Sequence, residues 1–389
     1  MHLLNNPVKD YAWGSRTDIA ELTGRPDPAP GPEAEMWLGA HPSGPSLLAG
    51  DDGRSLADLI GADPRGQLGA ATLDRFGERL PYLMKLIAVA QPLSLQVHPS
   101  AEQAVDGHGR GVYGDPWPKP ELVCALTPFT ALAGFRPCEQ AAMLVDRLGV
   151  PDLREVVSLL EAGAPLKALE ALLGKRESAD QVVWAASAVH HPDYDLVVRL
   201  ARRYPGDPAC LAPLLLRKHE LAPGQAIFLG AGVLHCYLKG FGVEIMGSSD
   251  NVMRAGLTPK PLHVEELLRI TDPDTAPLAL QAGTDGVYDT PAPEFRLRRL
   301  TANGDGPSPG SSAGSSAGSS TAGPGAGLGA GEVHLPGGVP RILLCTEGTS
   351  TVGATDLRQG ESLFIPASEP TTLARTTGTL FLAEPGTPH

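Results

Sequence analysis

Residues 138–213 interrupt the sequence with a helical pattern, and this interruption constrains the fold more than any other feature. Segments such as "PDLREVVSLLEAG" carry apolar residues at three- and four-residue spacing, with Gly and Pro between the segments. That spacing is typical of amphipathic helices. On both sides of this block, short apolar runs separated by turn residues are typical of strands. The chain is therefore expected to be mainly β with a helical subdomain.

Residues 303–332, which are rich in Gly, Ser, Ala and Pro, mark a second interruption. Such a stretch holds too little apolar surface to fold and predicts a flexible insertion. The length of 389 residues is compatible with two or three domains. We expect residues 1–137 and 214–275 to form one β unit around the helical subdomain 138–213. Residues 276–389 are expected to form a second β unit that contains the insertion.

Two segments of the chain echo each other and suggest that the two β units are related. "LAPGQAIFLGAGVLH" (221–235) aligns with "LRQGESLFIPASEPT" (357–371), and Leu, Gly, Phe and Ala recur in register. The first copy ends in His235 and the second in Thr371. A metal ligand at this position is therefore expected only in the first unit.

Charge and cysteine usage exclude several classes of protein. The formal charge of -13 argues against a general nucleic-acid or membrane-surface binder, since either needs a basic face. The five cysteines form no C-x-x-C pair, which favours a reducing cytoplasm over a disulfide framework. Neither a signal-peptide pattern nor an apolar run long enough to span a membrane is present in the sequence. We expect a soluble cytoplasmic protein.

The stretch "LSLQVHP" (93–99) alternates apolar and polar residues. Because side chains alternate between the faces of a strand, Ser94, Gln96 and His98 are expected on one face. This face is either exposed to water on a half-buried strand or lines a site.

Further polar residues are compatible with a metal site on that face. "WPKPELV" places Lys119 and Glu121 two residues apart, and His235 ends an apolar strand after a Gly-rich turn. Two imidazoles, one carboxylate and one amide oxygen suit a divalent ion such as zinc. With a single carboxylate the site keeps a net positive charge, as suits a Lewis acid that holds an anionic oxygen. Each short pattern is common by itself.

The polar stretch "SSDNVMRAGLTPKPLH" (248–263) contains Asp250, Arg254 and Lys260. Arg grips a phosphate with paired hydrogen bonds, and Lys supplies a point charge. Asp250 is a candidate orienting group or base. The alternative is a solvated loop in which Asp250 and Arg254 form an ion pair.

Together these stretches resemble the type I mannose-6-phosphate isomerase (phosphomannose isomerase) family, zinc enzymes of the cupin superfamily. The motifs that carry the resemblance are "YAWGS", "EMWLGAHPSGPS", "LPYLMKLIAVAQPLSLQVHPS", "KPEL" and "DNVMRAGLTPK". Pro118 departs from the family, in which many members have His, and the insertion 303–332 also departs from it. The resemblance implies one metal-bearing and one degenerate, metal-free cupin-type jelly roll.

The resemblance also implies roles for individual residues. The four residues that match the family's zinc ligands are Gln96, His98, Glu121 and His235. Arg254 matches a residue usually assigned to the active site, and Lys260 matches a phosphate-contacting Lys. Ser94 and Lys119 match residues that line the sugar-phosphate pocket. Asp250 matches a residue sometimes proposed to assist proton transfer.

The implied reaction is the interconversion of mannose 6-phosphate and fructose 6-phosphate by proton transfer through a cis-enediol(ate). Lys119, Asp250 and a water on the zinc are the candidate proton carriers. We expect one zinc per chain, a sugar phosphate as substrate, a monomer, and a place in mannose metabolism, including GDP-mannose biosynthesis. The alternatives are a cupin oxygenase that uses iron and a non-catalytic sugar-phosphate-binding cupin.

Overall fold

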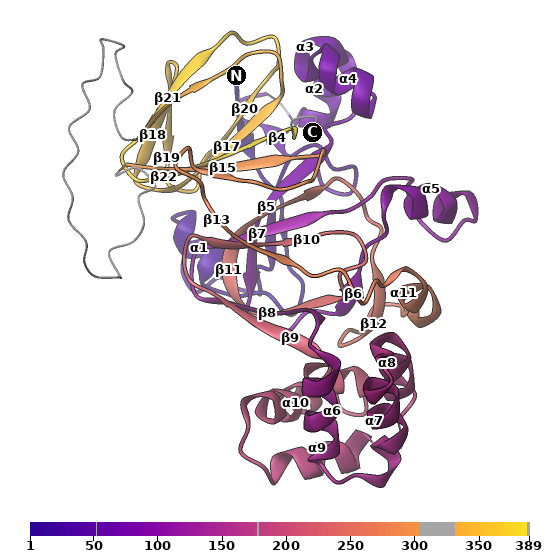
Figure 1. Cartoon of the computed structure of the whole chain (residues 1–389). Helices are drawn as coiled ribbons and strands as arrows, with labels where there is room; N and C mark the ends of the chain where they lie inside the picture. Colours follow the sequence, from indigo (N-terminus) through magenta and orange to yellow (C-terminus); the bar gives the residue numbers. More distant parts are fainter. Residues whose placement is uncertain (52, 177–178, 303–330, 387–389) are drawn as a thin grey trace, which may run out of the picture.

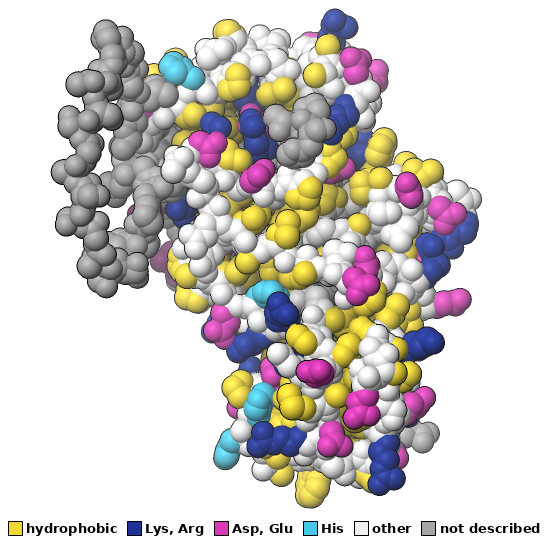
Figure 2. Space-filling model, viewed as in Figure 1, with side chains coloured by type: hydrophobic (Ala, Val, Ile, Leu, Met, Phe, Trp, Pro, Cys, Tyr) yellow, Lys and Arg dark blue, Asp and Glu magenta, His cyan; other side chains and the backbone are white. Residues whose placement is uncertain are grey.

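The computed structural model describes residues 1–51, 53–176, 179–302 and 331–386. The described chain is mainly antiparallel β with a separate group of helices, as Figure 1 shows. The expected fold class is thereby confirmed. No helix among the described residues is long and apolar enough to cross a membrane. On the face drawn in Figure 2, basic and acidic side chains are interspersed.

The largest sheet carries the residues singled out above. Its main path runs β13-β10-β7-β11-β5-β3-β2, and β6, β8, β9 and β12 pair at its margin. The strands are β2 (Val8–Lys9), β3 (Glu35–Leu38), β5 (Tyr82–Val89), β6 (Leu95–Val97), β7 (Glu121–Ala125), β8 (Phe129–Phe135), β9 (Leu216–Leu221), β10 (Gln225–Leu229), β11 (His235–Gly247), β12 (Met253–Gly256) and β13 (Leu278–Gln281).

Strand β11 joins the two parts of this sheet. Its second half pairs with β5 and β7, whereas its first half pairs with β6 and β8. The change occurs around Gly240, where a Cβ atom would lie 2.5 Å from the ring of Phe129. Only glycine allows the strands to approach this closely. As a result, His235 at the start of β11 lies directly opposite Gln96 in β6.

The helical block begins at Cys138 and ends in a short 3-10 helix at Pro208–Leu214. Figure 1 shows it as a compact group at one end of the molecule. Its members pack around a shared apolar cluster that includes Val156, Leu172 and Leu200. The other helices of the block are Pro151–Leu153 (3-10), α6 (Cys138–Asp146), α7 (Arg154–Glu161), α8 (Pro165–Leu173), α9 (Ala179–Ser187) and α10 (Pro192–Arg203).

The first 136 residues contain more helix than the strand-like pattern predicts. The helices are α1 (Asp18–Leu22), α2 (Leu56–Ala62), α3 (Pro64–Leu68), α4 (Ala70–Phe76) and α5 (Ala101–Gly109), and α11 (Val264–Ile270) follows the second β segment. Local caps explain two of them. Ser55 is the N-cap of α2 and Ser100 is the N-cap of α5, and each forms a capping box with the residue three positions later.

The C-terminal part contains two further sheets around an apolar cluster that includes Leu343, Leu363 and Leu382. The first sheet is ordered β14 (Val287–Tyr288), β15 (Arg296–Thr301), β22 (Thr379–Glu384), β17 (Arg341–Glu347), β20 (Ser362–Ile365), β1 (His2–Asn5) and β4 (Leu47–Leu48). The second sheet is ordered β16 (Glu332–Leu335), β21 (Thr372–Thr376), β18 (Thr349–Val352) and β19 (Thr355–Arg358). The N-terminal strand β1 pairs with β20, so the first residues of the chain complete a C-terminal sheet.

The expected insertion 303–332 falls almost entirely outside the described residues, which resume at Gly331. Its expected end is wrong, because Glu332 already pairs with Arg375 as the first residue of β16. The echoed segments occupy equivalent places. Gly224 before β10 has a φ of 84°, and Gly360 before β20 has a φ of 86°. Both glycines have a positive φ, a backbone conformation that other residues rarely adopt, and each makes a turn before its strand.

Candidate active site

Three buried side chains from different strands meet beside the β6–β11 pair. His98 directly follows β6, Glu121 begins β7 and His235 begins β11. One imidazole nitrogen or carboxylate oxygen from each lies within 4.8 Å of the others. The Nε2 atoms of His98 and His235 lie 3.2 Å and 3.5 Å from the two oxygens of Glu121. The structure thus brings these three residues, selected from the sequence, close together.

The chemistry of these atoms fits a metal ion. His98 Nδ1 lies 2.9 Å from the carbonyl of Asn251, and His235 Nδ1 lies 2.9 Å from that of Val233. Each Nδ1–H can donate to its carbonyl, which leaves Nε2 as the lone-pair nitrogen that a metal needs. The Nε2 of His98 and one oxygen of Glu121 are buried without a hydrogen bond to the described residues.

Burial and charge keep His98 and Glu121 in their metal-binding forms. Burial lowers the pKa of His98 to about 4 and thereby favours the neutral imidazole. Burial by itself would raise the pKa of Glu121, but Lys119 and His98 hold that pKa well below its usual range. The site therefore offers a neutral imidazole at His98 and an ionised carboxylate at Glu121.

Gln96 lies next to this group, as the alternation in "LSLQVHP" predicts. Its amide nitrogen is 3.2 Å from His235 Nε2, and its amide oxygen accepts a hydrogen bond from Ser94 at 2.8 Å. Rotating the amide by 180° exchanges its oxygen and nitrogen with little change of shape. Gln96 can thus present an oxygen to the same point as the two histidines.

Lys119 is buried and donates a hydrogen bond to Glu121. Its ammonium nitrogen also lies 3.2 Å from the sulfur of Met246. Lys119 and Glu121 both line a cavity of about 670 Å³, together with Ser94 and Gln96. Four of the residues selected from sequence therefore share one cavity wall.

Arg254 and Lys260 line the same cavity from the 248–263 stretch. Arg254 lies in β12, opposite Gln96 in β6. Its Nε is buried without a hydrogen-bond partner among the described residues, and burial lowers the pKa of the guanidinium. The ammonium of Lys260 lies 4.3 Å from the ring centre of Tyr11, and burial lowers the pKa of this group too. Arg254 is thus held partly desolvated at the cavity, whereas Lys260 is exposed to solvent at its edge.

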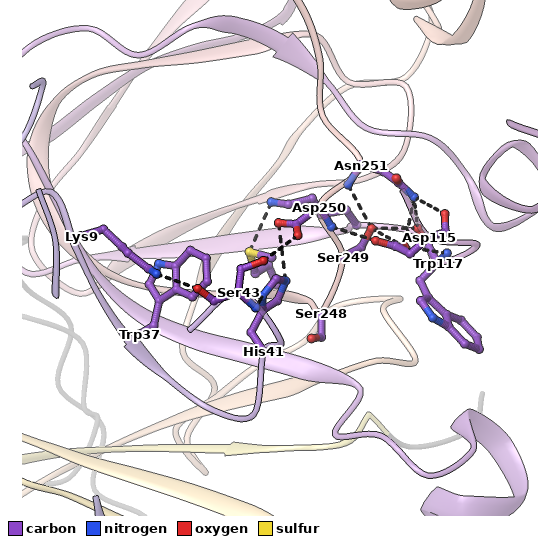
Figure 3. A network of polar contacts seen from close by, with 12 residues as sticks. Lys9, Trp37, His41, Ser43, Asp115, Trp117, Ser248, Ser249, Asp250 and Asn251 are labelled. Carbon is purple, nitrogen blue, oxygen red and sulfur yellow. Dashed lines mark hydrogen bonds and ion pairs between the residues drawn. The ribbon is translucent and has the colours of Figure 1, made fainter. Parts of the chain in front are cut away.

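Asp250 lies at the rim of the cavity, with 62% of its side chain exposed. One of its oxygens is 3.6 Å from Nε2 of His41, and the other accepts a hydrogen bond from Ser43 at 3.2 Å (Figure 3). No ion pair joins Asp250 to Arg254 among the described side chains, so the ion pair of the solvated-loop alternative is not formed.

Asp115 connects the loop before Glu121 to the 248–251 turn, as Figure 3 shows. Its carboxylate accepts hydrogen bonds from the Ser249 hydroxyl at 2.8 Å and from the backbone N–H of Asp250 at 3.0 Å. The Asn251 amide donates to the backbone carbonyl of Asp115 at 2.7 Å. Since the Asn251 carbonyl faces His98, Asp115 helps to orient a candidate metal ligand. The sequence analysis missed it, and no local pattern in the sequence marks it.

A buried ionic group in the cavity wall was also missed. Lys85 in β5 lies 3.2 Å from Glu244 in β11 and 3.7 Å from Glu35 in β3. Burial opposes the charge of Lys85, but the two carboxylates raise its pKa, while burial raises that of Glu244. The signal in the sequence was one charged residue inside each of the apolar runs "YLMKLIAV" and "FGVEIMG". Such residues are seldom buried without a partner.

Comparisons with known proteins identify the family of this chain. Residues 1–138 match the family described as "Phosphomannose isomerase type I, catalytic domain". A mannose-6-phosphate isomerase of Escherichia coli (strain K12) is 34% identical over 402 residues, which cover 95% of each chain.

The chain belongs to the type I phosphomannose isomerase family.

Other members of the family extend the match. The mannose-6-phosphate isomerase of Homo sapiens is 32% identical over 77% of this chain and 82% of its own. A crystal structure of a phosphomannose isomerase variant from Salmonella typhimurium has a TM-score of 0.83 and 31% identity, and covers 99% of both chains. Another family structure, a mannose 6-phosphate isomerase bound with zinc and yttrium, has a TM-score of 0.83 and 30% identity.

Proposed function

We propose that this chain interconverts mannose 6-phosphate and fructose 6-phosphate with one zinc ion per chain. The observation that carries the proposal is the buried group of His98, Glu121 and His235, which adjoins a cavity containing Arg254 and Lys260. The relatives named mannose-6-phosphate isomerase and the zinc-bound family structure support the same reaction and the same metal.

The proposed zinc ligands are Gln96, His98, Glu121 and His235. When bound, zinc supplies a Lewis acid that stabilises negative charge on a substrate oxygen. The protein contributes the two carbonyl-anchored imidazoles and a carboxylate kept ionised beside Lys119. Because only one ligand is an anion, the site retains positive charge toward the substrate. With the Gln96 amide rotated, its N–H would donate to the Ser94 hydroxyl and its oxygen would face the ion; Ser94 also lines the substrate cavity.

Isomerisation requires a proton to move between C1 and C2 through a cis-enediol(ate). Of the two candidate side chains, we favour Lys119, because it is buried in the cavity wall beside Glu121. Asp250 is mostly exposed and already binds His41 and Ser43. We assign Asp250 to orienting the cavity rim.

Arg254 and Lys260 have different roles in this proposal. Arg254 is held next to Gln96 by the β6–β12 pairing, so it stabilises the enediolate oxygen with planar, paired donors. Lys260 lies farther along the loop and binds the phosphate as a point charge. Arg254 has lost part of its hydration, which strengthens its attraction for an anion.

The broader expectations remain part of the proposal. We expect the protein to be a cytoplasmic monomer that binds neither nucleic acid nor membranes. We also expect its reaction to belong to mannose metabolism, including GDP-mannose biosynthesis. The division into residues 1–137, 138–213, 214–275 and 276–389 also remains a proposal. The formal charge of -13 supports the absence of a nucleic-acid partner.

A coupled assay tests the proposal directly. Purified protein is supplied with zinc and mannose 6-phosphate, and formation of fructose 6-phosphate is followed over time. Turnover is the expected result, without oxygen uptake. Oxygen uptake with iron would instead indicate a cupin oxygenase. Saturable binding of mannose 6-phosphate with no turnover would indicate a sugar-binding protein.

A further inference from the structure

Leu257, between Arg254 and Lys260, has an unusual backbone. Among the described residues it is the only non-glycine residue with a positive φ, at 57°. This conformation is unfavourable for a residue with a Cβ atom and persists only where its surroundings hold it. Leu257 is buried and lines the cavity. The turn between the two cations is therefore held in place by contacts from elsewhere.

One such contact comes from the helical block. Asp207, immediately before the 3-10 helix Pro208–Leu214, accepts a hydrogen bond from the Leu257 N–H at 2.7 Å. Its other oxygen accepts one from the Ala209 N–H at 2.9 Å. One carboxylate thus joins the end of the helical block to the active-site loop.

The approach of these two segments is close. A Cβ atom on Gly256 would lie 2.4 Å from the Cβ of Ala209 and 2.6 Å from an oxygen of Asp207. Only glycine fits at this point. The loop backbone therefore packs directly on Asp207, and loss of the carboxylate would remove the group that binds the Leu257 N–H.

Two contacts besides Asp207 hold parts of the loop: the Leu257 side chain packs in the apolar cluster of the helical block, and Lys260 lies over the ring of Tyr11. Among the described residues, the hydrogen bond of the Leu257 N–H goes to Asp207. At the base of the loop, the Arg254 carbonyl accepts a hydrogen bond from the His263 N–H at 2.8 Å. Beyond the turn, the Lys260 N–H donates to the Thr258 hydroxyl at 3.2 Å, which is a contact within the loop. Arg254 is also fixed by its strand, whereas Lys260 is not in a strand.

We propose that Asp207 is a positioning residue for phosphate binding. Its carboxylate holds the turn at Leu257 and thereby sets where Lys260 meets the phosphate of the substrate. The helical block thus takes part in substrate affinity without contacting the reacting carbons. This inference rests on the proposed function, in which Lys260 binds the phosphate.

The test compares Asp207→Ala, Asp207→Asn and the matched control Glu170→Ala, which removes an exposed carboxylate of the same block. Loss of a hydrogen bond to a charged group changes the equilibrium constant of the process that depends on it by about tenfold. In Asp207→Ala we expect KM for mannose 6-phosphate and the inhibition constant of inorganic phosphate to rise by about that factor. Asp207→Asn keeps one acceptor oxygen and should show a smaller rise. Glu170→Ala should match the wild type.

Two further readouts separate positioning from general damage. We expect kcat to stay within threefold and zinc content to stay unchanged, because neither Arg254 nor the zinc ligands bind Asp207. Backbone amide exchange of the peptide 255–262 should be faster in Asp207→Ala than in the wild type. If Asp207→Ala fails to fold, the same measurements are compared between Asp207→Asn and the wild type.

The outcomes distinguish this inference from the proposed function. KM, phosphate inhibition and amide exchange within twofold of the wild type would overturn the positioning role. Loss of zinc together with a fall in kcat would also overturn it, because Asp207 would then support the whole site. A wild-type protein that does not turn over mannose 6-phosphate would refute the proposed function. The exchange measurement would then still test whether Asp207 holds the loop.

Discussion

Replacing Arg254 by Lys should reduce catalysis although the charge is kept. Arg254 is fixed opposite Gln96 in the β6–β12 pair. Its Nε is buried without a partner among the described residues, and the hydrogen bond that its guanidinium makes among the described residues, to the Val252 carbonyl, is long at 3.4 Å. The guanidinium therefore has donors available for a substrate oxygen, in a fixed plane. Lysine has one nitrogen on a flexible chain and cannot reproduce this arrangement.

The size of the effect follows from the role assigned to Arg254. Loss of one preorganised donor to a developing oxyanion costs about 2.7–4 kcal/mol in other enzymes. At about 1.4 kcal/mol per factor of ten, the lower value corresponds to roughly a hundredfold fall in kcat. The retained positive charge places the expected loss near this lower value. A ground-state phosphate clamp would instead raise KM and leave kcat nearly unchanged.

The assay is the steady-state kinetics of Arg254→Lys on mannose 6-phosphate, with zinc content confirmed. Arg199→Lys, an exposed arginine of α10, is the matched control and should behave as the wild type. If kcat of Arg254→Lys stays within threefold of the wild type while KM rises steeply, Arg254 is a binding residue and the catalytic assignment fails.

Three further changes test other parts of the account. His235→Ala should lose both zinc and activity, and stoichiometric zinc after dialysis of the variant would remove His235 from the ligand set. Asp115→Ala should weaken zinc binding about 10–100-fold, as changes next to a metal ligand do, and an unchanged affinity in chelator competition would refute its orienting role. Replacing 303–330 by a short Gly/Ser link should keep kcat within twofold. The two residues that flank this stretch lie close together, since a Cβ on Gly331 would be 3.1 Å from Cα of Ala302. Each doubling of loop length changes the free energy of loop closure by only ~0.6 kcal/mol. A more than tenfold loss with an intact fold would contradict this.

Local patterns were enough to find the residues that share a strand face or a short motif. The alternation of Ser94, Gln96 and His98 depends only on the period of a strand, and the structure brings them together. Glu121 was found in the motif "KPEL", and His235 was found at the end of an apolar strand after a Gly-rich turn. Both meet the others only through long-range strand pairing.

Other residues of the site depend on contacts that no local pattern specifies. Lys85 and Glu244 are partners because β5 and β11 are neighbours in register. Asp207 reaches Leu257 across fifty positions. The helices of residues 55–76 were missed because short helices with caps resemble the turn-rich pattern of a strand region. In each case strand pairing, a long-range contact or helix capping, rather than periodicity, decides which residues meet or which segment is helical.

The central claim is that one zinc ion at His98, Glu121 and His235 makes this chain an isomerase of mannose 6-phosphate. The most direct test is to strip the protein with a chelator and titrate zinc back while fructose 6-phosphate formation is measured. The account predicts that activity is lost on stripping, then rises linearly with added zinc and levels off at one equivalent per chain. Activity that persists after complete removal of zinc, or zinc-loaded protein that forms no fructose 6-phosphate, would contradict it.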